Sequence, residues 1–229
     1  MMQDKTLASG QAKNVHATTL KVNEIFYSLQ GETTFTGLPT VFVRLTGCPL
    51  RCSYCDTEYA FHAGTGLTFE QIVKQISCYK TRFVTVTGGE PLAQKSCLEL
   101  LELLCDEGYV VTLETSGAMD ISGVDNRVCR ILDIKTPGSG EEKNNRLENL
   151  EYLQKHDQVK FVICDRSDYE WAIAFTKKYC LADKYNVLFS PAYEQLQATQ
   201  LADWILEDRL NVRLQIQLHK YLWGDVPGK

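Results

Sequence analysis

The sequence predicts an α/β protein whose core is a partial, open parallel β/α barrel of about six βα units. Short apolar runs of strand length alternate along the chain with segments whose apolar residues recur at helical spacing. This alternation is typical of parallel βαβ units. A closed barrel of eight units usually needs about 250 residues. The chain has 229 residues, so we expect the barrel to stay open.

The first expected strand is short, at residues 23–28, and an apolar run at residues 41–45 predicts a second, buried strand. Thr68 is a typical helix-capping residue ahead of apolar residues at helical spacing. Gly108 is typical of the position after a helix end. Further strands are expected at residues 83–87, 109–114, 130–134, 159–163, 186–190 and 212–218, and helices at residues 68–76, 96–104, 147–154, 168–178 and 200–208.

The composition indicates one folded domain, residues 21–229, after a poorly ordered tail at residues 1–20. The tail is polar and lacks the apolar core of a signal peptide. No run approaches the ~18 apolar residues of a membrane span, so no membrane partner is expected. A net charge of −5 leaves no basic surface for nucleic acid. Reduced cysteines outside a disulfide scaffold indicate the cytoplasm.

The most informative motif is C-x3-C-x2-C, formed by Cys48, Cys52 and Cys55 in the loop after residues 41–45. Three neighbouring thiolates indicate a site for a soft metal. A structural zinc ion needs four ligands, and so does a [4Fe–4S] cube held only by protein. With three ligands, one iron of a cube stays open for a small molecule. Alternatively, His62 completes a Cys3His zinc site. Most of the other cysteines are expected to act as small apolar residues; they are Cys78, Cys97, Cys105, Cys129, Cys164 and Cys180.

Four expected strands end in polar residues, at residues 48–57, 87–91, 114–117 and 133–135. Chemistry in parallel barrels collects at these ends, so we expect one site there. In the G-G-E-P sequence at residues 88–91, Glu90 offers oxygens to an ammonium group and the glycines let a ligand approach the backbone. Two structural alternatives stay open. G-G-E-P can simply start a helix, and Asp133 and Lys135 can form an ordinary ion pair.

C-x3-C-x2-C followed one strand later by G-G-E-P resembles the signature of the radical S-adenosylmethionine (SAM) enzymes. The resemblance implies a barrel of the radical SAM type and a [4Fe–4S] cluster on the three cysteines. In that superfamily, SAM chelates the open iron, and one electron from the reduced cluster cleaves it to methionine and a 5'-deoxyadenosyl radical. The implied SAM-binding residues are Tyr54, Cys55, Asp56, Gly89, Glu90, Glu114, Ser116 and Lys135.

Further motifs narrow the resemblance. They are Q-G-E at residues 30–32, G-L-P at 37–39, F-V-R-L at 42–45, C-D-T at 55–57 and H-K-Y-L-W-G at 219–224. Together they are similar to the 7-carboxy-7-deazaguanine synthase family, over the chain from about residue 23 to its end. Thr33, Pro49 and Tyr54 depart from the commoner pattern of that family, but none of these changes removes a ligand.

The family resemblance implies conversion of 6-carboxy-5,6,7,8-tetrahydropterin to 7-carboxy-7-deazaguanine with loss of ammonia, on the way to queuosine and other 7-deazapurines. It also implies Mg²⁺ bound by Thr57, a homodimer, an electron donor such as flavodoxin or ferredoxin, and no catalytic residue beyond the cluster and SAM. Arg44 suits a substrate carboxylate as a bidentate donor, and a strand-end salt bridge is its alternative. The implied substrate-binding residues are Leu29, Gln30, Gly31, Arg44, Thr87 and His219.

Two other functions stay open from the sequence. A glycyl-radical enzyme activase shares the cysteine and G-G-E-P motifs, but it would give Gln30, Arg44 and Thr57 no task. A zinc-stabilised binding module would leave the polar strand ends and the Q-G-E turn as solvated surface.

The C-terminal segment is expected to lie over the site. The last expected strand runs parallel to the others, so its end brings His219 to the edge that carries the cysteines. A radical reaction needs shielding from water. We expect residues 220–229 to close the pterin pocket; the alternative is that Tyr221 and Trp223 plug the open side of the barrel.

Changing Cys48, Cys52 or Cys55 to alanine is expected to abolish SAM cleavage, because each thiolate should hold one iron. The measurement is the yield of 5'-deoxyadenosine from anaerobically reconstituted protein. Cys78→Ser is the control and should keep the activity. A Cys52→Ala protein with a full cluster and normal activity would contradict the assignment.

Overall fold

The computed structural model describes residues 18–224, 226 and 228. Of the tail expected at residues 1–20, residues 1–17 lie outside this part of the chain. The folded chain begins earlier than residue 21, because Thr19 is already in the first strand and Leu20 is 1% exposed. Within the described part, no helix is long and apolar enough to cross a membrane.

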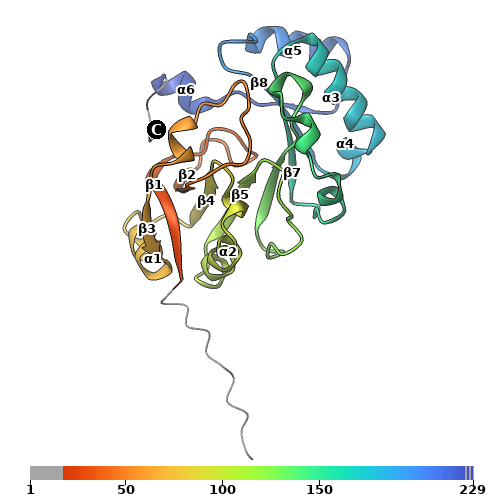
Figure 1. Cartoon of the computed structure of the whole chain (residues 1–229). Helices are drawn as coiled ribbons and strands as arrows, with labels where there is room; N and C mark the ends of the chain where they lie inside the picture. The colour runs from red at the N-terminus through yellow and green to blue at the C-terminus, as the bar shows by residue number, and fades with distance from the viewer. Residues whose placement is uncertain (1–17, 225, 227, 229) are drawn as a thin grey trace, which may run out of the picture.

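One curved, open sheet forms the centre of the molecule (Figure 1) and consists of β1 (Thr19–Leu29), β2 (Pro39–Leu45), β3 (Thr65–Thr68), β4 (Phe83–Gly88), β5 (Val110–Thr115), β6 (Cys129–Asp133), β7 (Gln158–Ile163), β8 (Asn186–Pro191) and β9 (Arg213–Leu214). Their order across the sheet is β3-β1-β2-β4-β5-β6-β7-β8-β9. From β2 to β9 all neighbours pair in parallel. The expected open, parallel β/α barrel is therefore confirmed.

The N-terminal edge of the sheet is antiparallel, which the sequence did not predict. Strand β1 pairs antiparallel with β2, and β3 pairs antiparallel with β1. The turn between β1 and β2 is short and includes Gly37 with a φ of 90°. Parallel strands need a long crossover, whereas a short turn can only return the chain antiparallel.

The described chain has six α-helices, namely α1 (Phe69–Ser77), α2 (Cys97–Asp106), α3 (Arg166–Lys178), α4 (Leu181–Lys184), α5 (Ala198–Glu207) and α6 (Leu218–Trp223). Thr68 caps α1 as expected: its side chain accepts from the backbone N–H of Gln71, whose side chain accepts from the N–H of Thr68. Helix α4 was not expected. The helix expected at residues 147–154 is a single 3-10 helix, Leu147–Glu151.

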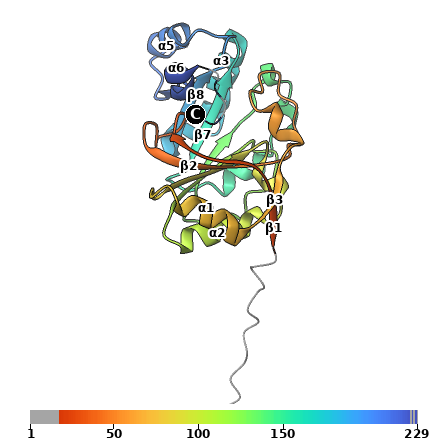
Figure 2. The same ribbon diagram turned by 90° about the vertical axis from the view of Figure 1, so that its left-hand side faces the viewer.

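Two crossovers lack α-helices within the described residues. Between β5 and β6 the chain forms a loop whose Ile121 and Val124 are buried in the core. Between β6 and β7 it forms only short 3-10 helices, including Pro137–Ser139. Apolar loop side chains therefore cover this part of the sheet in place of a helix. Helices α1 and α2 lie on the same outer side of the curved sheet (Figure 2).

The expected last strand at residues 212–218 is wrong. Strand β9 ends at Leu214, and residue 218 already begins α6. Past β9, the chain turns toward the loop after β1: the side-chain amide of Gln215 donates to the carbonyl of Gly31 at 3.1 Å, and the N–H of Leu218 donates to the same oxygen at 3.2 Å. The backbone N–H of Gln215 still donates to Phe189 of β8 at 2.9 Å, so the chain leaves the sheet only after this residue.

The core contains a fully buried ion pair. Arg130 is 1% exposed and Asp157 is 0% exposed. The Asp157 carboxylate accepts from the guanidinium of Arg130 at 3.0 Å, from its backbone N–H at 2.7 Å, and from the N–H of Gln154 at 2.7 Å. The pair joins the start of β6 to the chain just before β7.

Asp157→Ala is expected to lower the free energy of unfolding by about 3–5 kcal/mol, because it leaves a buried guanidinium without its counter-charge. Urea denaturation measures the change. Glu170→Ala is the control, since it breaks an exposed ion pair with Arg166 and should leave stability nearly unchanged. Equal stability of the two variants would show that the buried pair is not needed.

Candidate active site

One cavity of about 370 Å³ lies at the carboxyl ends of the parallel strands, where the loops after β2, β4, β5 and β6 meet. Of the site residues expected from the sequence, all except Glu90 line it. They are Leu29, Gln30, Gly31, Arg44, Cys48, Cys52, Tyr54, Cys55, Asp56, Thr57, Thr87, Gly89, Glu114, Ser116, Lys135 and His219.

The three cysteines of the motif are free, half-buried thiols on one wall of this cavity. Burial raises the pKa of Cys48 and brings the pKa of Cys52 to about 11. The loop is held at its start by backbone hydrogen bonds: the N–H of Gly47 donates to Ala60 at 2.9 Å, and the N–H of Glu90 donates to Gly47 at 2.8 Å. Of the other cysteines, Cys97 and Cys129 are buried, while Cys78 and Cys180 are exposed and so are not core residues.

The two glycines at the end of β4, Gly88 and Gly89, make room for the end of β2 and for the cysteine loop. A Cβ atom on Gly89 would lie 2.5 Å from the carbonyl oxygen of Gly47 and 2.7 Å from the Cβ of Cys48. A Cβ atom on Gly88 would collide with the backbone of Leu45, and its φ is 158°. The sequence interpretation gave this space to a ligand. In the structure the protein's own backbone occupies it.

Glu90 lies behind the cavity wall and is 0% exposed. Its carboxylate accepts from the N–H of Leu92 at 3.0 Å, from the hydroxyl of Thr115 at 2.9 Å, and from the N–H of Ser116 at 2.7 Å; the Ser116 hydroxyl also donates to it. G-G-E-P does begin a 3-10 helix, Pro91–Ala93, with Glu90 as its cap. Glu90 therefore joins the end of β4 to the end of β5.

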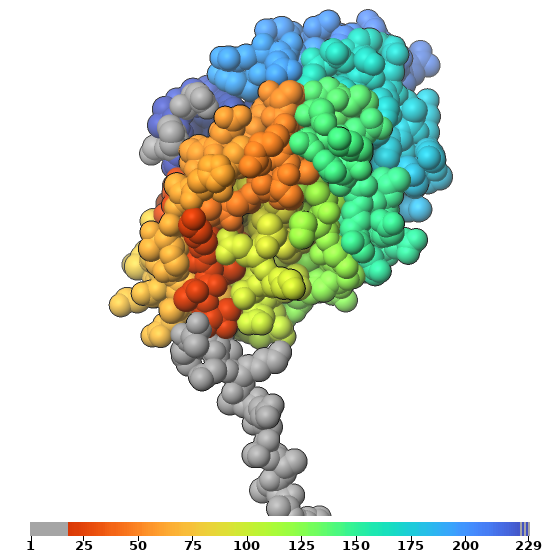
Figure 3. All heavy atoms as spheres, viewed as in Figure 1, coloured from red at the N-terminus to blue at the C-terminus, as the bar shows by residue number. Residues whose placement is uncertain are grey.

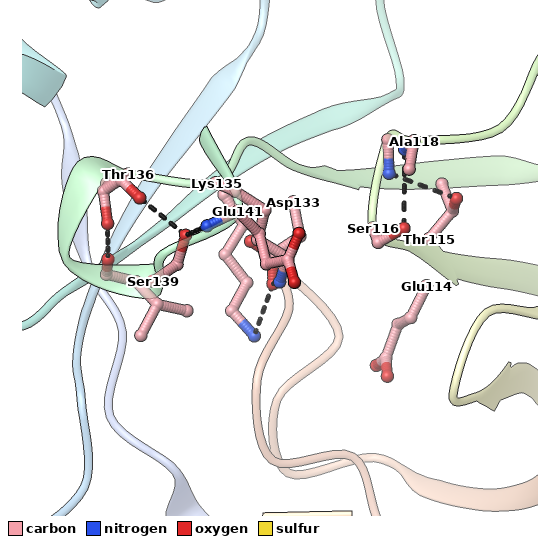
Figure 4. A network of polar contacts seen from close by, with 12 residues as sticks. Glu114, Thr115, Ser116, Ala118, Asp133, Lys135, Thr136, Ser139 and Glu141 are labelled. Carbon is pink, nitrogen blue, oxygen red and sulfur yellow. Dashed lines mark hydrogen bonds and ion pairs between the residues drawn. The ribbon is translucent and has the colours of Figure 1, made fainter. Parts of the chain in front are cut away.

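The ends of β5 and β6 carry polar groups that line the same cavity as the cysteines; Glu114, Ser116, Asp133 and Lys135 are labelled in Figure 4. The ammonium of Lys135 lies 3.1 Å from a carboxylate oxygen of Asp133, so the expected ion pair is present and lines the cavity. Burial alone would lower the pKa of Lys135, but Asp133 raises it above its usual value. Two buried atoms here, the Tyr54 hydroxyl and the other Asp133 oxygen, have no hydrogen-bond partner within the described chain. A ligand with polar groups fits this wall.

The donor set suits an iron–sulfur cluster with a polar ligand better than a zinc ion. His62, the fourth ligand of the zinc alternative, is not among the residues that line the cavity. In the described chain, no three His, Cys, Asp or Glu side chains are grouped as a single metal ion requires. A cube distributes its cysteines over several irons, so three thiols spread along one wall are compatible with it.

The opposite wall is built on the end of β1. Gln30 is 2% exposed, so the Q-G-E segment is no solvated turn. Its amide donates to Glu114 at 3.2 Å and to Thr85 at 3.1 Å, and its oxygen accepts from the N–H of Gly31 at 2.7 Å. Thr87 donates to the second oxygen of Glu114 at 2.9 Å. Burial, together with the charge of Glu32, raises the pKa of Glu114.

Arg44 points from β2 toward the same cavity and is not free of protein contacts. Its Nε lies 2.7 Å from a carboxylate oxygen of Glu24, so the strand-end salt bridge is present. The Tyr59 hydroxyl donates to the same oxygen at 2.8 Å. The guanidinium lies 5.6 Å from the ring centroid of Phe26, which stacks on Phe42 at 4.9 Å. These rings and the guanidinium all line the cavity, and could receive a flat ring that carries a carboxylate.

Two charged residues that line the cavity, Glu32 and Lys160, were not predicted from the sequence as site residues. Lys160 of β7 forms an ion pair with Glu32 and lies 3.8 Å from Asp133. Burial opposes both charges, but Lys160 lowers the pKa of Glu32, and Glu32 and Asp133 raise the pKa of Lys160. The sequence feature that could have revealed Lys160 is its position in the apolar run 159–163. Its neighbour Phe161 is buried and points to the other face of the sheet, so Lys160 faces the cavity.

The C-terminal segment forms part of the cavity wall. His219 packs so closely on Gly31 that a Cβ atom there would collide with its ring. Burial lowers the pKa of His219, so the neutral imidazole is favoured at pH 7. Lys220 lies 2.9 Å from Asp56, to which the Thr57 hydroxyl donates at 3.0 Å. Lys220, Gly224, Val226 and Gly228 line the cavity as well.

The fold and the site together define the class of protein. A profile of the Radical SAM superfamily matches residues 42–136. The crystal structure of QueE from Escherichia coli has the same fold, with a TM-score of 0.75 at 24% identity over 91% of this chain and 99% of that one. The protein is a radical SAM enzyme.

Sequence relatives identify the particular family. A 7-carboxy-7-deazaguanine synthase from Koribacter versatilis is 42% identical over 219 residues, which is 89% of this chain and 97% of the relative. Another from Chlorobaculum tepidum is 43% identical over 208 residues, 90% of this chain and 94% of the relative. The chain belongs to the 7-carboxy-7-deazaguanine synthase family.

Gly89→Ala is expected to reduce cluster loading, because the added methyl group would displace the loop at Cys48. Overpacking of this kind costs about 1–3 kcal/mol. Iron content per chain after reconstitution and the thermal midpoint measure the two effects. Gly66→Ala in β3 is the control, since a Cβ atom on Gly66 would have no neighbouring atom within 4 Å. Normal iron content in Gly89→Ala would contradict the packing role.

Proposed function

We propose that this protein converts 6-carboxy-5,6,7,8-tetrahydropterin to 7-carboxy-7-deazaguanine with loss of ammonia, as a radical SAM carbon–nitrogen lyase. The observation that carries the proposal is that one cavity joins the cysteine triad to Arg44 and the Q-G-E segment. Family membership supports the same activity. It does not favour the glycyl-radical activase, which would leave the Q-G-E segment and Arg44 without a task.

The cysteine side of the cavity would hold the cluster and SAM. Cys48, Cys52 and Cys55 would ligate three irons, and the bound cluster with SAM would supply the radical that starts the reaction. Ser116, Lys135 and the unpartnered oxygens of Tyr54 and Asp133 would bind the polar groups of SAM. Glu90 has no free oxygen for the SAM ammonium, so it would act by holding Ser116 in place. Tyr54, Cys55, Asp56, Gly89 and Glu114 complete the proposed SAM site.

The β1 side would bind the pterin. Arg44 would pair with the substrate carboxylate through its terminal nitrogens while Glu24 holds its Nε. Glu114 is held by Gln30 and Thr87, so these two residues would link the pterin side to the SAM site. Leu29, Gly31 and a neutral His219 would close the pocket around the ring and exclude water.

Thr57 is proposed as the protein ligand of Mg²⁺. It follows directly on Cys55 and Asp56 and lines the cavity. Its hydroxyl donates to Asp56, which Lys220 engages in turn, so its oxygen lone pairs stay available to a cation. Bound magnesium usually keeps several water or substrate oxygens as ligands, so a single protein oxygen is a chemically reasonable contribution to its coordination.

The remaining proposals rest on the family alone. They are a homodimer, a flavodoxin or ferredoxin as electron donor, a cytoplasmic location and a place in queuosine synthesis for tRNA modification.

A direct test combines anaerobically reconstituted protein with the pterin, SAM, Mg²⁺ and dithionite. The expected product is 7-carboxy-7-deazaguanine with ammonia, identified by mass spectrometry. Cys52→Ala protein is the matched control and should give no product. A wild-type protein that binds a cluster and cleaves SAM but leaves the pterin unchanged would refute the substrate assignment.

Thr57→Ala is expected to raise the Mg²⁺ concentration needed for half-maximal activity by about tenfold or more, as loss of a metal-binding group does. Iron content and SAM binding should stay nearly unchanged. Thr65→Ala, on exposed strand β3, is the control. An unchanged Mg²⁺ dependence would remove Thr57 from the metal site.

A further inference from the structure

The loop after β6, residues 136–141, holds the outer half of the cysteine loop. The N–H of Ser53 donates to the carbonyl of Ser139 at 3.0 Å, and the Ser53 hydroxyl donates to the carbonyl of Gly138 at 2.7 Å. Figure 3 shows the orange segment that follows β2 lying against the green segment that follows β6. The cysteine loop is therefore bound to a second loop that carries no cluster ligand.

A third hydrogen bond strengthens this contact. The backbone N–H of Arg51 donates to a carboxylate oxygen of Glu141 at 2.6 Å. Cys52 lies between Arg51 and Ser53, so the contacts flank this one ligand on both sides. Cys48 is held differently, by the packing of Gly89 described above.

The supporting loop is itself tightly bonded. The Ser139 hydroxyl donates to the carbonyl of Thr136 at 2.6 Å and accepts from the N–H of Glu141 at 3.0 Å (Figure 4). Thr136 and Ser139 are both fully buried. The shape of the loop at residues 136–141 therefore depends on the buried residues that pack against it.

Beneath it lies Asp168, in the first turn of α3 and only 1% exposed. One carboxylate oxygen accepts from the N–H of Gly138 at 2.7 Å. The other accepts from the N–H of Cys164 at 3.1 Å and lies 3.0 Å from the Thr136 hydroxyl. A Cβ atom on Gly138 would collide with this carboxylate, so the loop sits directly on it.

We propose that Asp168 is a positioning residue for the cluster: it holds the loop at residues 136–141, and through it Cys52, at the place where iron is bound. The proposal rests on the proposed cluster at the cysteine triad. A carboxylate is needed because donors approach both of its oxygens. An amide would offer one oxygen, and its NH2 group would face another donor.

Asp168→Asn tests the proposal in the reconstituted full-length protein. Its release of iron to a chelator is expected to be about tenfold faster than wild type, the size typical of residues that orient metal ligands. The EPR spectrum of the reduced cluster with SAM should change as well. Glu170→Gln is the control, because it makes the same chemical change on the same helix at a 63% exposed side chain.

Ser53→Ala removes the side-chain contact to the supporting loop and completes a double-mutant cycle. If both residues act on Cys52 through one path, the double variant should release iron little faster than either single variant. Additive effects, or an Asp168→Asn protein that melts earlier but keeps the wild-type iron release and EPR spectrum, would overturn the proposal.

A replacement variant and the iron content of the wild-type protein complete the test. If Asp168→Asn does not fold, Thr136→Val takes its place in the same cycle with Ser53→Ala, because it removes a hydroxyl at the same carboxylate. A wild-type protein that loads no iron would refute the proposed function, and this inference with it. A wild-type protein that loads iron normally, with no difference in the variants, would refute this inference alone.

Discussion

The geometry of the site depends first on Glu90. Its backbone N–H holds the start of the cysteine loop at Gly47, and its buried carboxylate holds the end of β5 at Thr115 and Ser116. One residue therefore sets the separation between the cysteine loop and the neighbouring cavity wall. Each buried donor that it satisfies would cost about 1–3 kcal/mol if left unpaired. The Gly-Gly pair before it allows this approach, since a Cβ atom on Gly88 would collide with β2 at Leu45 and one on Gly89 with the cysteine loop.

The parts of the protein that can be predicted from sequence are those that local patterns encode. The apolar runs predicted the parallel strands, and the close spacing of Cys48, Cys52 and Cys55 predicted that they lie together, as they do in the cavity. The partners that a side chain contacts in the folded protein are not encoded locally. The sequence suggested that Glu90 faces a ligand, whereas in the structure protein donors surround its carboxylate. The segment after Leu214 was mispredicted for a similar reason: it has strand composition, but the Gln215 side chain and the N–H of Leu218 both donate to Gly31, which is far away in the sequence.

The cavity carries charge of alternating sign from one wall to the other. Glu32 pairs with Lys160, Lys160 lies 3.8 Å from Asp133, and Asp133 lies 3.1 Å from Lys135. Each buried charge is thereby compensated by a neighbour, which offsets its desolvation. Such a row presents fixed dipoles rather than a net charge, and fixed dipoles need little reorganisation when a polar ligand reacts beside them. It also connects the wall proposed for the pterin to the wall proposed for SAM.

The contact between Gly31 and the C-terminal segment joins residues 184 positions apart. During synthesis, the N-terminal part of a chain can begin to fold before the rest has left the ribosome. The first two strands and the cysteine loop come early in this chain, whereas α6, with His219 and Lys220, follows β9. A nascent chain would thus present its cysteines before the wall made by α6 could dock, because α6 follows every strand of the sheet. The thiols are thereby accessible at an earlier stage of synthesis than the stage at which α6 encloses the pocket.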